Sequence, residues 1–372
     1  MPNRRMAAFF TVVLLIWTAM NVYVFWRISS IPAIAHVPRT ALVVAGVILW
    51  GSYIAGRILS HRGIQSLAAP LEWIGSYWLG VIFLLLVSLI AVEIITGFGF
   101  LLPQQAATWR WYAAVAAGAL SVIALVQGFR APAISSYEVR LAGLPSALDG
   151  TVVAVATDMH VGETIGGSWL ARRVDQIQLL RPDLIILGGD IVEGDKDARE
   201  VIGAFWRLSA PLGVFAVTGN HEFYAGVEAS VRFLEGTGIQ VLRDRWVELR
   251  PGLVLAGVDD LTARRQYGEH GNFVQQALAG RPNPAATVFV SHTPWHVEKA
   301  RDLGTGLMLS GHTHAGQIWP FVYLVRIQYP FVSGKYDLSG MTLFVCRGTG
   351  TWGPRMRLWR RSEILRITLR AA

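Results

Sequence analysis

Four long stretches without a charged residue lie within the first 130 residues, and they restrict the possible folds more than any other feature. They cover residues 6–26, 40–56, 73–92 and 111–129 and are 21, 17, 20 and 19 residues long. A helix that crosses a bilayer needs about 20 mainly apolar residues, with a range of roughly 17 to 25. Four such stretches in succession disfavour the core of a soluble domain. We therefore expect a four-helix transmembrane anchor over residues 1–130.

The charge of the chain fits a membrane protein better than a nucleic-acid-binding protein. The formal net charge is +8, of which +6 belongs to residues 1–130 and +2 to the remainder. A basic balance that lies in the apolar half indicates membrane topology, so we expect the lipid bilayer as a partner and no nucleic acid. The single cysteine, Cys346, excludes an internal disulfide framework.

Arginines between the apolar stretches predict the orientation in the membrane. If the helices alternate, one side carries Arg4, Arg5, Arg57, Arg62, Arg130 and Arg140, and the other carries Arg27, Arg39 and Arg110. This excess predicts that the N-terminus and the residues after 130 are cytoplasmic, in an inner membrane if the source is bacterial. A twin-arginine export signal is the alternative, but a cleaved signal has an apolar core of roughly 7 to 15 residues, shorter than this stretch.

Glu93 directly follows the third apolar stretch. An ionisable group inside a membrane is a functional-site candidate. Glu93 can instead lie at the interface if its helix ends nearby, with Gly97, Gly99 and Pro103 marking a turn. We adopt the interfacial interpretation and expect the helices to anchor the chain and not to transport a solute.

From about residue 136 short apolar runs alternate with amphipathic segments. Buried strands are predicted over residues 151–156, 184–187, 214–217, 253–258, 287–290 and 343–345, with helices over 168–180, 198–208, 227–235 and 296–303. This alternation is typical of an α/β domain, whose functional groups follow the carboxyl ends of strands. We expect a linker and first edge strand over 131–149, the domain over 150–372, and a final edge strand over 364–369.

Polar clusters follow several of these predicted strands. Five of the nine histidines lie in the clusters, namely His160, His221, His292, His312 and His314. Asp158, Asp190 and Asn220 lie beside them. One histidine at a strand end is more often a structural residue, but this concentration indicates a functional site.

Imidazole, carboxylate and amide oxygen are ligands suited to divalent Mn, Fe, Zn or Co, and the absence of thiolates argues against structural zinc. Seven candidate ligands exceed the needs of one catalytic ion and suit two ions that share a carboxylate. Two ions about 3.5 to 4 Å apart serve the hydrolysis of phosphate esters. The sequence therefore predicts a site for two divalent metal ions.

The order of these residues resembles the signature of the calcineurin-like metallophosphoesterases over roughly residues 150–350. Its five blocks are Asp158-x-His160, Gly189-Asp190, Gly219-Asn220-His221-Glu222, His292 and Gly311-His312-x-His314. The resemblance implies an α/β/β/α sandwich with two sheets packed between helices. It also implies a metal-dependent phosphoric ester or pyrophosphate hydrolase, in which a hydroxide held between the two ions attacks phosphorus.

The resemblance also implies a role for each residue. One ion would be bound by Asp158, His160 and His314, and the other by Asn220, His292 and His312. Asp190 would bridge the two ions. His221 resembles the non-ligand histidine of the family, which orients the substrate phosphate and can protonate the leaving group.

Residues 311–320 resemble a bacterial subgroup that joins membrane segments to this domain, including UDP-2,3-diacylglucosamine pyrophosphohydrolases of lipid A synthesis. Ala315 replaces the glycine that is usual there. The anchor favours a lipid-linked or membrane-proximal phosphodiester or pyrophosphate. A soluble nucleotide is the second candidate substrate. A non-catalytic scaffold or sensor is disfavoured, because all seven ligands and His221 are retained.

Two further segments leave alternatives open. Residues 318–331 are too apolar for an ordinary exposed loop, so they either contact membrane or acyl chains beside the site or pack on the sheet. Residues 347–372 carry seven arginines against Glu363 alone. These arginines either bind anionic headgroups or form a solvated strand face.

Overall fold

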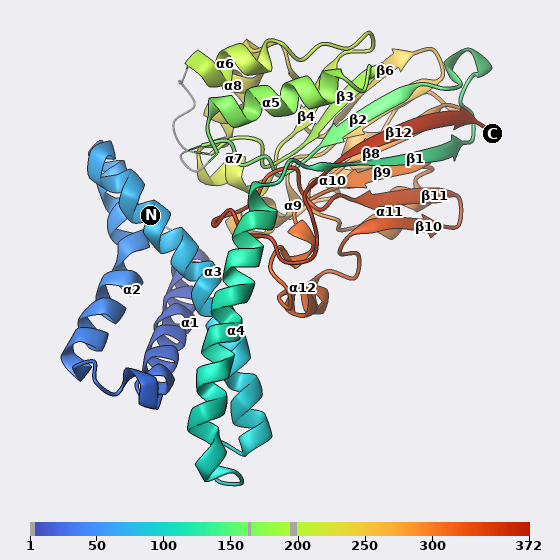
Figure 1. Cartoon of the computed structure of the whole chain (residues 1–372). Helices are drawn as coiled ribbons and strands as arrows, with labels where there is room; N and C mark the ends of the chain where they lie inside the picture. Colours follow the sequence, from blue (N-terminus) through green and yellow to red (C-terminus); the bar gives the residue numbers. More distant parts are fainter. Residues whose placement is uncertain (1–3, 163–164, 194–198) are drawn as a thin grey trace. The chain divides into compact units, whose positions relative to one another are not determined.

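The computed structural model describes residues 4–162, 165–193 and 199–372 (Figure 1). The chain forms two compact units. One comprises Met1–Phe129 with Gly353–Leu358, and the other comprises Arg130–Trp352 with Trp359–Ala372. Each unit is described by itself below.

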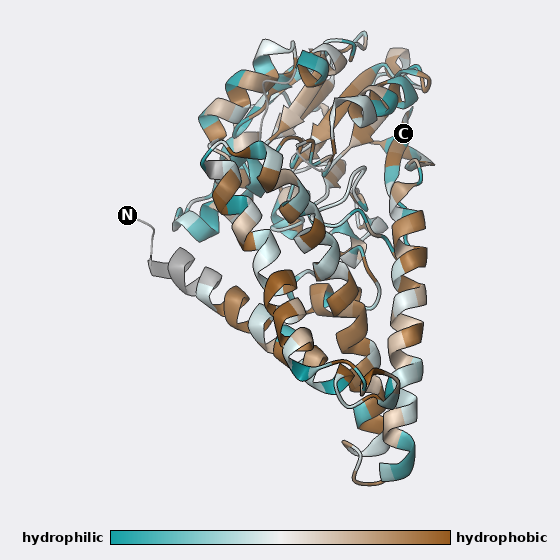
Figure 2. Ribbon diagram, turned by 60° about the vertical axis from the view of Figure 1, so that its left-hand side comes forward, coloured by the Kyte–Doolittle hydropathy of each residue, from teal (hydrophilic) through white to brown (hydrophobic). Residues whose placement is uncertain are grey.

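The first unit consists of four long helices. They are α1 (Arg4–Ile28), α2 (Arg39–His61), α3 (Gln65–Thr96) and α4 (Pro103–Phe129), with a short 3-10 helix η1 (Pro32–Ile34) between the first two. Each of the four is long and apolar enough to cross a membrane, and Figure 2 shows hydrophobic residues along them. The predicted four apolar helices are confirmed, and the chain is a membrane protein.

A buried cluster of charges joins three of these helices. Glu93 of α3 is buried, and its carboxylate lies 2.7 Å from Nε of Arg110 in α4 and 3.1 Å from Nη2 of Arg27 in α1. The helix α3 ends three residues later, and Gly97 follows it in the left-handed region at φ 57°. The carboxylate is thus held by two arginines near the end of the helix.

The third helix is longer than the uncharged stretch from which it was predicted. It begins at Gln65, so a second acidic residue, Glu72, lies inside it and is buried. Glu72 lies 3.7 Å from Nη1 of Arg57 in α2. A charge marks the end of an uncharged stretch but not the end of a helix, because a paired carboxylate can be buried.

A short C-terminal segment, Gly353–Leu358, belongs to the helical unit. The backbone N–H of Arg357 donates to the carbonyl of Ala124 at 2.8 Å. The guanidinium of Arg355 lies over the ring of Phe129, 4.2 Å from its centroid. These two arginines therefore belong to the helical unit, whereas the other basic residues of the C-terminus belong to the second unit.

The second unit contains two six-stranded sheets. The first has the order β1-β12-β2-β3-β4-β5 and the second the order β10-β11-β9-β8-β7-β6. The strands of the first are β1 (Ala133–Leu141), β2 (Val152–Ala156), β3 (Leu184–Gly188), β4 (Val214–Val217), β5 (Gln240–Val241) and β12 (Glu363–Ala371). Those of the second are β6 (Arg245–Arg250), β7 (Leu253–Gly257), β8 (Ala286–Val290), β9 (Leu307–Ser310), β10 (Gly334–Leu338) and β11 (Met341–Val345).

The second unit also contains helices, several of which pack on the outer faces of the two sheets. The α-helices of this unit are α5 (Gly167–Gln178), α6 (Arg199–Phe205), α7 (Asn220–Tyr224), α8 (Val227–Gly236), α9 (Leu261–Tyr267), α10 (Phe273–Leu278), α11 (Val297–Asp302) and α12 (Val322–Gln328). Residue 198, the first of the predicted helix over 198–208, lies outside the described residues.

Alternate residues of each strand face different cores, as the period of two requires. In β2, Val153 and Val155 pack between the two sheets, whereas Ala154 and Ala156 face the helices α5, α6 and α8. A third core lies between the second sheet and helices α10 and α11. The result is the predicted α/β/β/α sandwich (Figure 1).

The predicted position of the last strand is wrong. We expected an edge strand over 364–369, but β12 lies between β1 and β2, parallel to the first and antiparallel to the second. The strand at that edge of the sheet is β1, and β5 forms the other edge. Alternating apolar residues describe the faces of a strand and contain no information about its partners, so an interior strand and an edge strand look alike in sequence.

Candidate metal centre

Every candidate ligand lies at the carboxyl end of a strand. Strands β2, β3 and β4 are parallel to one another, as are β7, β8 and β9. The loops that follow β2, β3, β8 and β9 and the start of α7 after β4 supply Asp158, His160, Asp190, Asn220, His292, His312 and His314. In the loop after β3 the structure describes the residues as far as Glu193.

The nitrogen and carboxylate atoms form two groups that share no residue, and a third group, made of His160, Asp190 and His221, that overlaps both. The ligand atoms of Asp158, His160 and His314 lie within 4.8 Å of one another, and so do those of Asp190, His292 and His312. In the first group the two imidazole Nε2 atoms are 3.0 Å apart. In the second, Nε2 of His292 lies 3.3 Å from Nδ1 of His312. Facing imidazole nitrogens at such distances suit the chelation of a cation.

Asp190 reaches both groups with one oxygen. Its Oδ2 lies 3.8 Å from Nε2 of His160 and 3.2 Å from Nε2 of His292. Its other oxygen, Oδ1, accepts the backbone N–H of His221 at 2.9 Å. Asp190 is therefore the residue placed to bridge two ions.

Asn220 provides a separate indication that cations belong here. Its Oδ1 atom is buried and has no hydrogen-bond partner among the residues that the structure describes. A buried oxygen without a partner costs about 1 to 3 kcal/mol. The cost is explained if this oxygen binds a metal ion, so the residues present fit two divalent ions.

The backbone of the ligand loops is unusual. Asp158, His160, Asp190, His312 and His314 have φ between 47° and 69°. For residues other than glycine this left-handed region costs roughly 1 to 2 kcal/mol each. Such positions cluster at functional sites, where the surrounding structure imposes them.

Comparisons with known proteins agree with this geometry. Residues 151–316 match the family model described as calcineurin-like phosphoesterase. The chain is 30% identical over 249 residues to an uncharacterised metallophosphoesterase of Aquifex aeolicus, which covers 64% of this chain and 91% of that protein. The chain belongs to the calcineurin-like metallophosphoesterases. That part of the sequence-based resemblance is confirmed.

Two other relatives of this metallophosphoesterase are named as transmembrane proteins. A transmembrane protein with metallophosphoesterase domain from Danio rerio is 35% identical over 268 residues, which are 68% of this chain and 61% of that protein. The Bos taurus protein of the same name is 31% identical, over 68% of this chain and 60% of its own. The chain thus spans about three fifths of these relatives.

Three histidines of the metallophosphoesterase domain are oriented by a second partner. Nδ1 of His160 lies 2.5 Å from Oε1 of Glu193, and Nδ1 of His292 lies 2.8 Å from the carbonyl oxygen of Gly188. Nε2 of His312 lies 2.8 Å from the hydroxyl of Tyr329. If each of these nitrogens donates its proton to the partner, the other ring nitrogen is left to bind a metal ion.

Sequence reasoning did not assign roles to Glu193 and Tyr329. Glu193 also contacts Nδ1 of His221, so one carboxylate holds a candidate ligand and the candidate acid. A signal existed, because Glu193 is an acidic residue three positions after Asp190 in the same loop. Tyr329 lies 17 residues beyond His312, and no spacing rule connects the two.

Glu222 connects two ligand loops. Its buried carboxylate accepts the backbone N–H groups of Gly219 at 2.7 Å and of three successive residues after β3, Asp190 at 2.9 Å, Ile191 at 2.7 Å and Val192 at 3.1 Å. Glu222 belongs to the third block of the sequence signature, and its contacts with the loop after β3 form only when the chain folds.

The surroundings of the site shift the pKa values of two histidines in opposite directions. Burial lowers the pKa of His221, but the carboxylates of Asp190 and Glu193 outweigh burial and raise this pKa to about 9. Burial and the neighbouring His292 lower the pKa of His312 to about 4. His312 is thus suited to bind an ion as neutral imidazole, and His221 to hold a proton.

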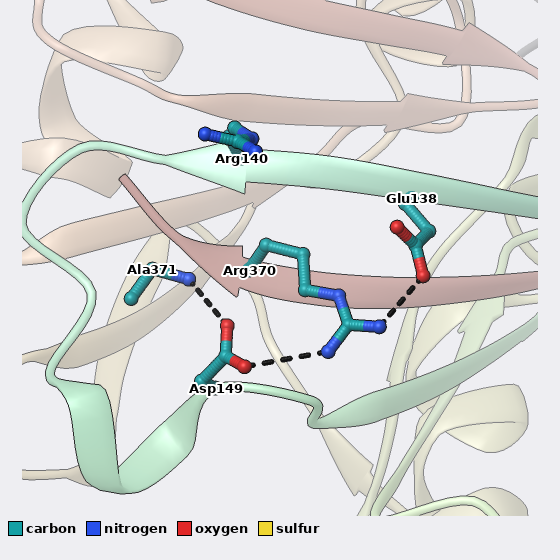
Figure 3. A pocket seen from close by; sticks show the side chains of 5 residues that line it. All are labelled: Glu138, Arg140, Asp149, Arg370 and Ala371. Carbon is teal, nitrogen blue, oxygen red and sulfur yellow. Dashed lines mark hydrogen bonds and ion pairs between the residues drawn. The ribbon is translucent and has the colours of Figure 1, made fainter.

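The C-terminal arginines of this unit do not form one patch. Arg347 pairs with Glu363. Arg370 donates to Glu138 at 2.7 Å and to Asp149 at 3.3 Å in a polar depression (Figure 3). This depression lies at the end of β12 that pairs with the start of β2, away from the ligand loops. Arg370 is therefore paired with two carboxylates there.

Proposed function

We propose that this chain is a membrane-anchored phosphoesterase that uses two divalent ions to hydrolyse a phosphodiester or pyrophosphate bond. The observation that supports it best is the pair of donor groups that share Asp190. In this proposal residues 1–130 are the anchor, 131–149 the linker and first edge strand, and 150–372 the phosphoesterase domain.

Each donor group would hold one ion. Asp158, His160 and His314 would bind the first, Asn220, His292 and His312 the second, and Asp190 both. When bound, Mn, Fe, Zn or Co ions at these positions supply Lewis acidity toward phosphoryl oxygens and lower the pKa of water for in-line attack.

His221 is proposed to orient the phosphate and to protonate the leaving group. It lies in α7 at the border of the site, with its ring centroid 4.8 Å from that of His160. Its side chain is partly exposed, at 19%, so a substrate can reach it. Glu193 fixes Nδ1 and favours the protonated ring, which leaves the opposite nitrogen to donate a proton.

The substrate is proposed to be lipid-linked or membrane-proximal, as part of lipid metabolism. The membrane helices support this, because they keep the domain beside a bilayer. Hydrolysis of UDP-diacylglucosamine-type pyrophosphates belongs to this proposal, and none of the relatives named above carries that activity in its name. A soluble nucleotide is the second candidate, and a non-catalytic scaffold the third.

The test uses the full chain in detergent with bis-p-nitrophenyl phosphate and, in separate assays, added Mn, Fe, Zn or Co ions. Asp190→Asn should remove both bound metal and turnover. His221→Ala should keep the metal content and lower turnover by about 100-fold, the lower end for general acid catalysis. His270→Ala, an exposed histidine elsewhere in the domain, is the matched control. No turnover with any of the four metals would favour the scaffold, and full turnover of His221→Ala would contradict the role of His221.

The domain is proposed to be cytoplasmic, as the arginine distribution predicts. The exposed residues His36 and Ser66 lie in segments separated by one span. Because the native Cys346 is buried, single cysteines at these positions can be labelled selectively. A membrane-impermeant maleimide added to intact cells should label His36→Cys and spare Ser66→Cys. The opposite pattern would reverse the orientation.

A further inference from the structure

An apolar surface is exposed next to the metal centre. It is formed by α12, by the residues just before it and by one residue of a later loop. Its exposed members are Trp319, Phe321, Tyr323, Leu324, Ile327 and Trp352. We refer to these six residues as the α12 surface.

Within this segment Phe331 packs against the core of the second sheet, but the helix α12 does not. None of the residues of α12 is buried. Leu324 is 55% exposed and Ile327 82% exposed. Only the ends of the segment are buried, at Ile318 before the helix and at Tyr329 and Val332 after it. The helix itself is therefore held at both ends and presents aliphatic and aromatic side chains outward.

Residues on both sides of the α12 surface lie next to the site. At the end of α12, the hydroxyl of Tyr329 is hydrogen-bonded to the candidate ligand His312. At the other end, Gln317 and the backbone of Trp352 exchange two hydrogen bonds of 2.9 Å. The ring of Trp352 lies 6.5 Å from that of His221. A molecule that covers the α12 surface therefore borders the place where phosphorus would bind.

The chemistry of the α12 surface matches the interface of a bilayer. Tryptophan and tyrosine prefer the headgroup region of membranes, and aliphatic side chains enter the acyl region below it. Residues 318–333 contain no acidic residue, and their one charge is Arg326, which suits an anionic lipid surface. In addition, α4 ends at Phe129 and β1 begins at Ala133, so only three residues connect a membrane span to this domain.

We infer that the α12 surface enters the headgroup region of the bilayer and delivers lipid phosphoesters to the metal centre. The delivery rests on the proposed function, whereas the contact with lipid does not. The acyl chain of the substrate lies along Leu324 and Ile327, and its phosphate lies between His221 and the ligand loops. The substrate class is an acylated phosphodiester or pyrophosphate.

Contact with lipid is tested in nanodiscs of phosphatidylcholine and phosphatidylglycerol that contain the full chain. Ile327→Cys is labelled with bimane, and Leu179→Cys is the matched control, since Leu179 is 81% exposed beside α5. Doxyl-labelled lipids should quench the probe at 327 and leave the probe at 179 unchanged. Equal quenching at the two positions, or none at 327, overturns the inference.

Delivery is tested with two chromogenic diesters, soluble bis-p-nitrophenyl phosphate and membrane-embedded hexadecyl p-nitrophenyl phosphate. In Leu324→Asp/Ile327→Asp the ratio of embedded to soluble rates should fall at least about tenfold, since each buried aliphatic side chain contributes more than that factor. Leu179→Asp should leave the ratio unchanged. An unchanged ratio in the double variant overturns delivery. If the unaltered chain hydrolyses neither diester, the proposed function fails, and the quenching still decides the contact with lipid.

Discussion

The hydroxyl of Tyr329 lies 2.8 Å from Nε2 of His312, and this contact orients a candidate metal ligand from outside the ligand loops. Tyr329→Phe keeps the ring, which stacks on Trp295, and removes the hydroxyl. We expect metal affinity to fall about tenfold, the lower end for the loss of such a partner. Titration of activity with Mn²⁺ measures it. Tyr267→Phe, an exposed tyrosine at the end of α9, is the control, and an equal effect in both variants would contradict the role of the hydroxyl.

Glu193 contacts both His160 and His221. Glu193→Gln keeps the shape and removes the charge, so turnover should fall about tenfold. The pKa of His221 is raised to about 9, so the protonated ring is present below that pH and lost above it. Without the charge of Glu193 this pKa falls, and the alkaline loss of activity should begin at lower pH.

A pH-rate profile of the full chain checks this prediction for Glu193. Glu235→Gln, an exposed position in α8, serves as the control. An unshifted alkaline limb in Glu193→Gln would show that this carboxylate does not set the pKa of His221.

Ala315→Gly and Gly316→Ala should have different effects on the stability of the protein. Ala315 has φ 55°, where alanine is strained, so Ala315→Gly should change stability by less than about 1 kcal/mol, because relief of strain offsets the entropy of glycine. At Gly316 a Cβ atom would lie 2.4 Å from the backbone nitrogen of Val322. Gly316→Ala should cost more than about 2 kcal/mol. Thermal unfolding in detergent compares the two, and equal losses would contradict the difference.

Glu93 should stabilise the helical unit. Glu93→Ala leaves Arg27 and Arg110 buried without their carboxylate, and the loss of one partner from such a pair costs about 3 to 5 kcal/mol. The melting temperature of the full chain in detergent should drop clearly. Arg39→Ala, an exposed residue at the start of α2, should leave it near the original value. A similar drop in both variants would argue against the ion cluster.

Sequence patterns predicted the parts of this fold that depend on local spacing. The six predicted strands correspond to β2, β3, β4, β7, β8 and β11. The seven candidate ligands follow strand ends, and six of them, all except Asn220, lie in groups of neighbouring donor atoms. Both follow from periodicity and from the rule that parallel strands place their carboxyl ends at one edge.

Contacts between distant segments were not predictable in the same way. The interior position of β12 depends on pairing with strands more than 200 residues earlier. The partners of His312 and Glu93 likewise come from other elements. The exposure of α12 contradicts the usual burial of apolar residues, and such an exception reflects function more than folding.

Glu222 has a consequence for the proposed metal centre when its ions are removed. Four backbone N–H groups bind its carboxylate, and none of these contacts involves an ion. The loops that carry Asp190 and Asn220 therefore keep their shape through the protein's own hydrogen bonds. Treatment with a chelator should empty the centre without unfolding the domain, and adding metal back should restore activity as fast as ions diffuse in.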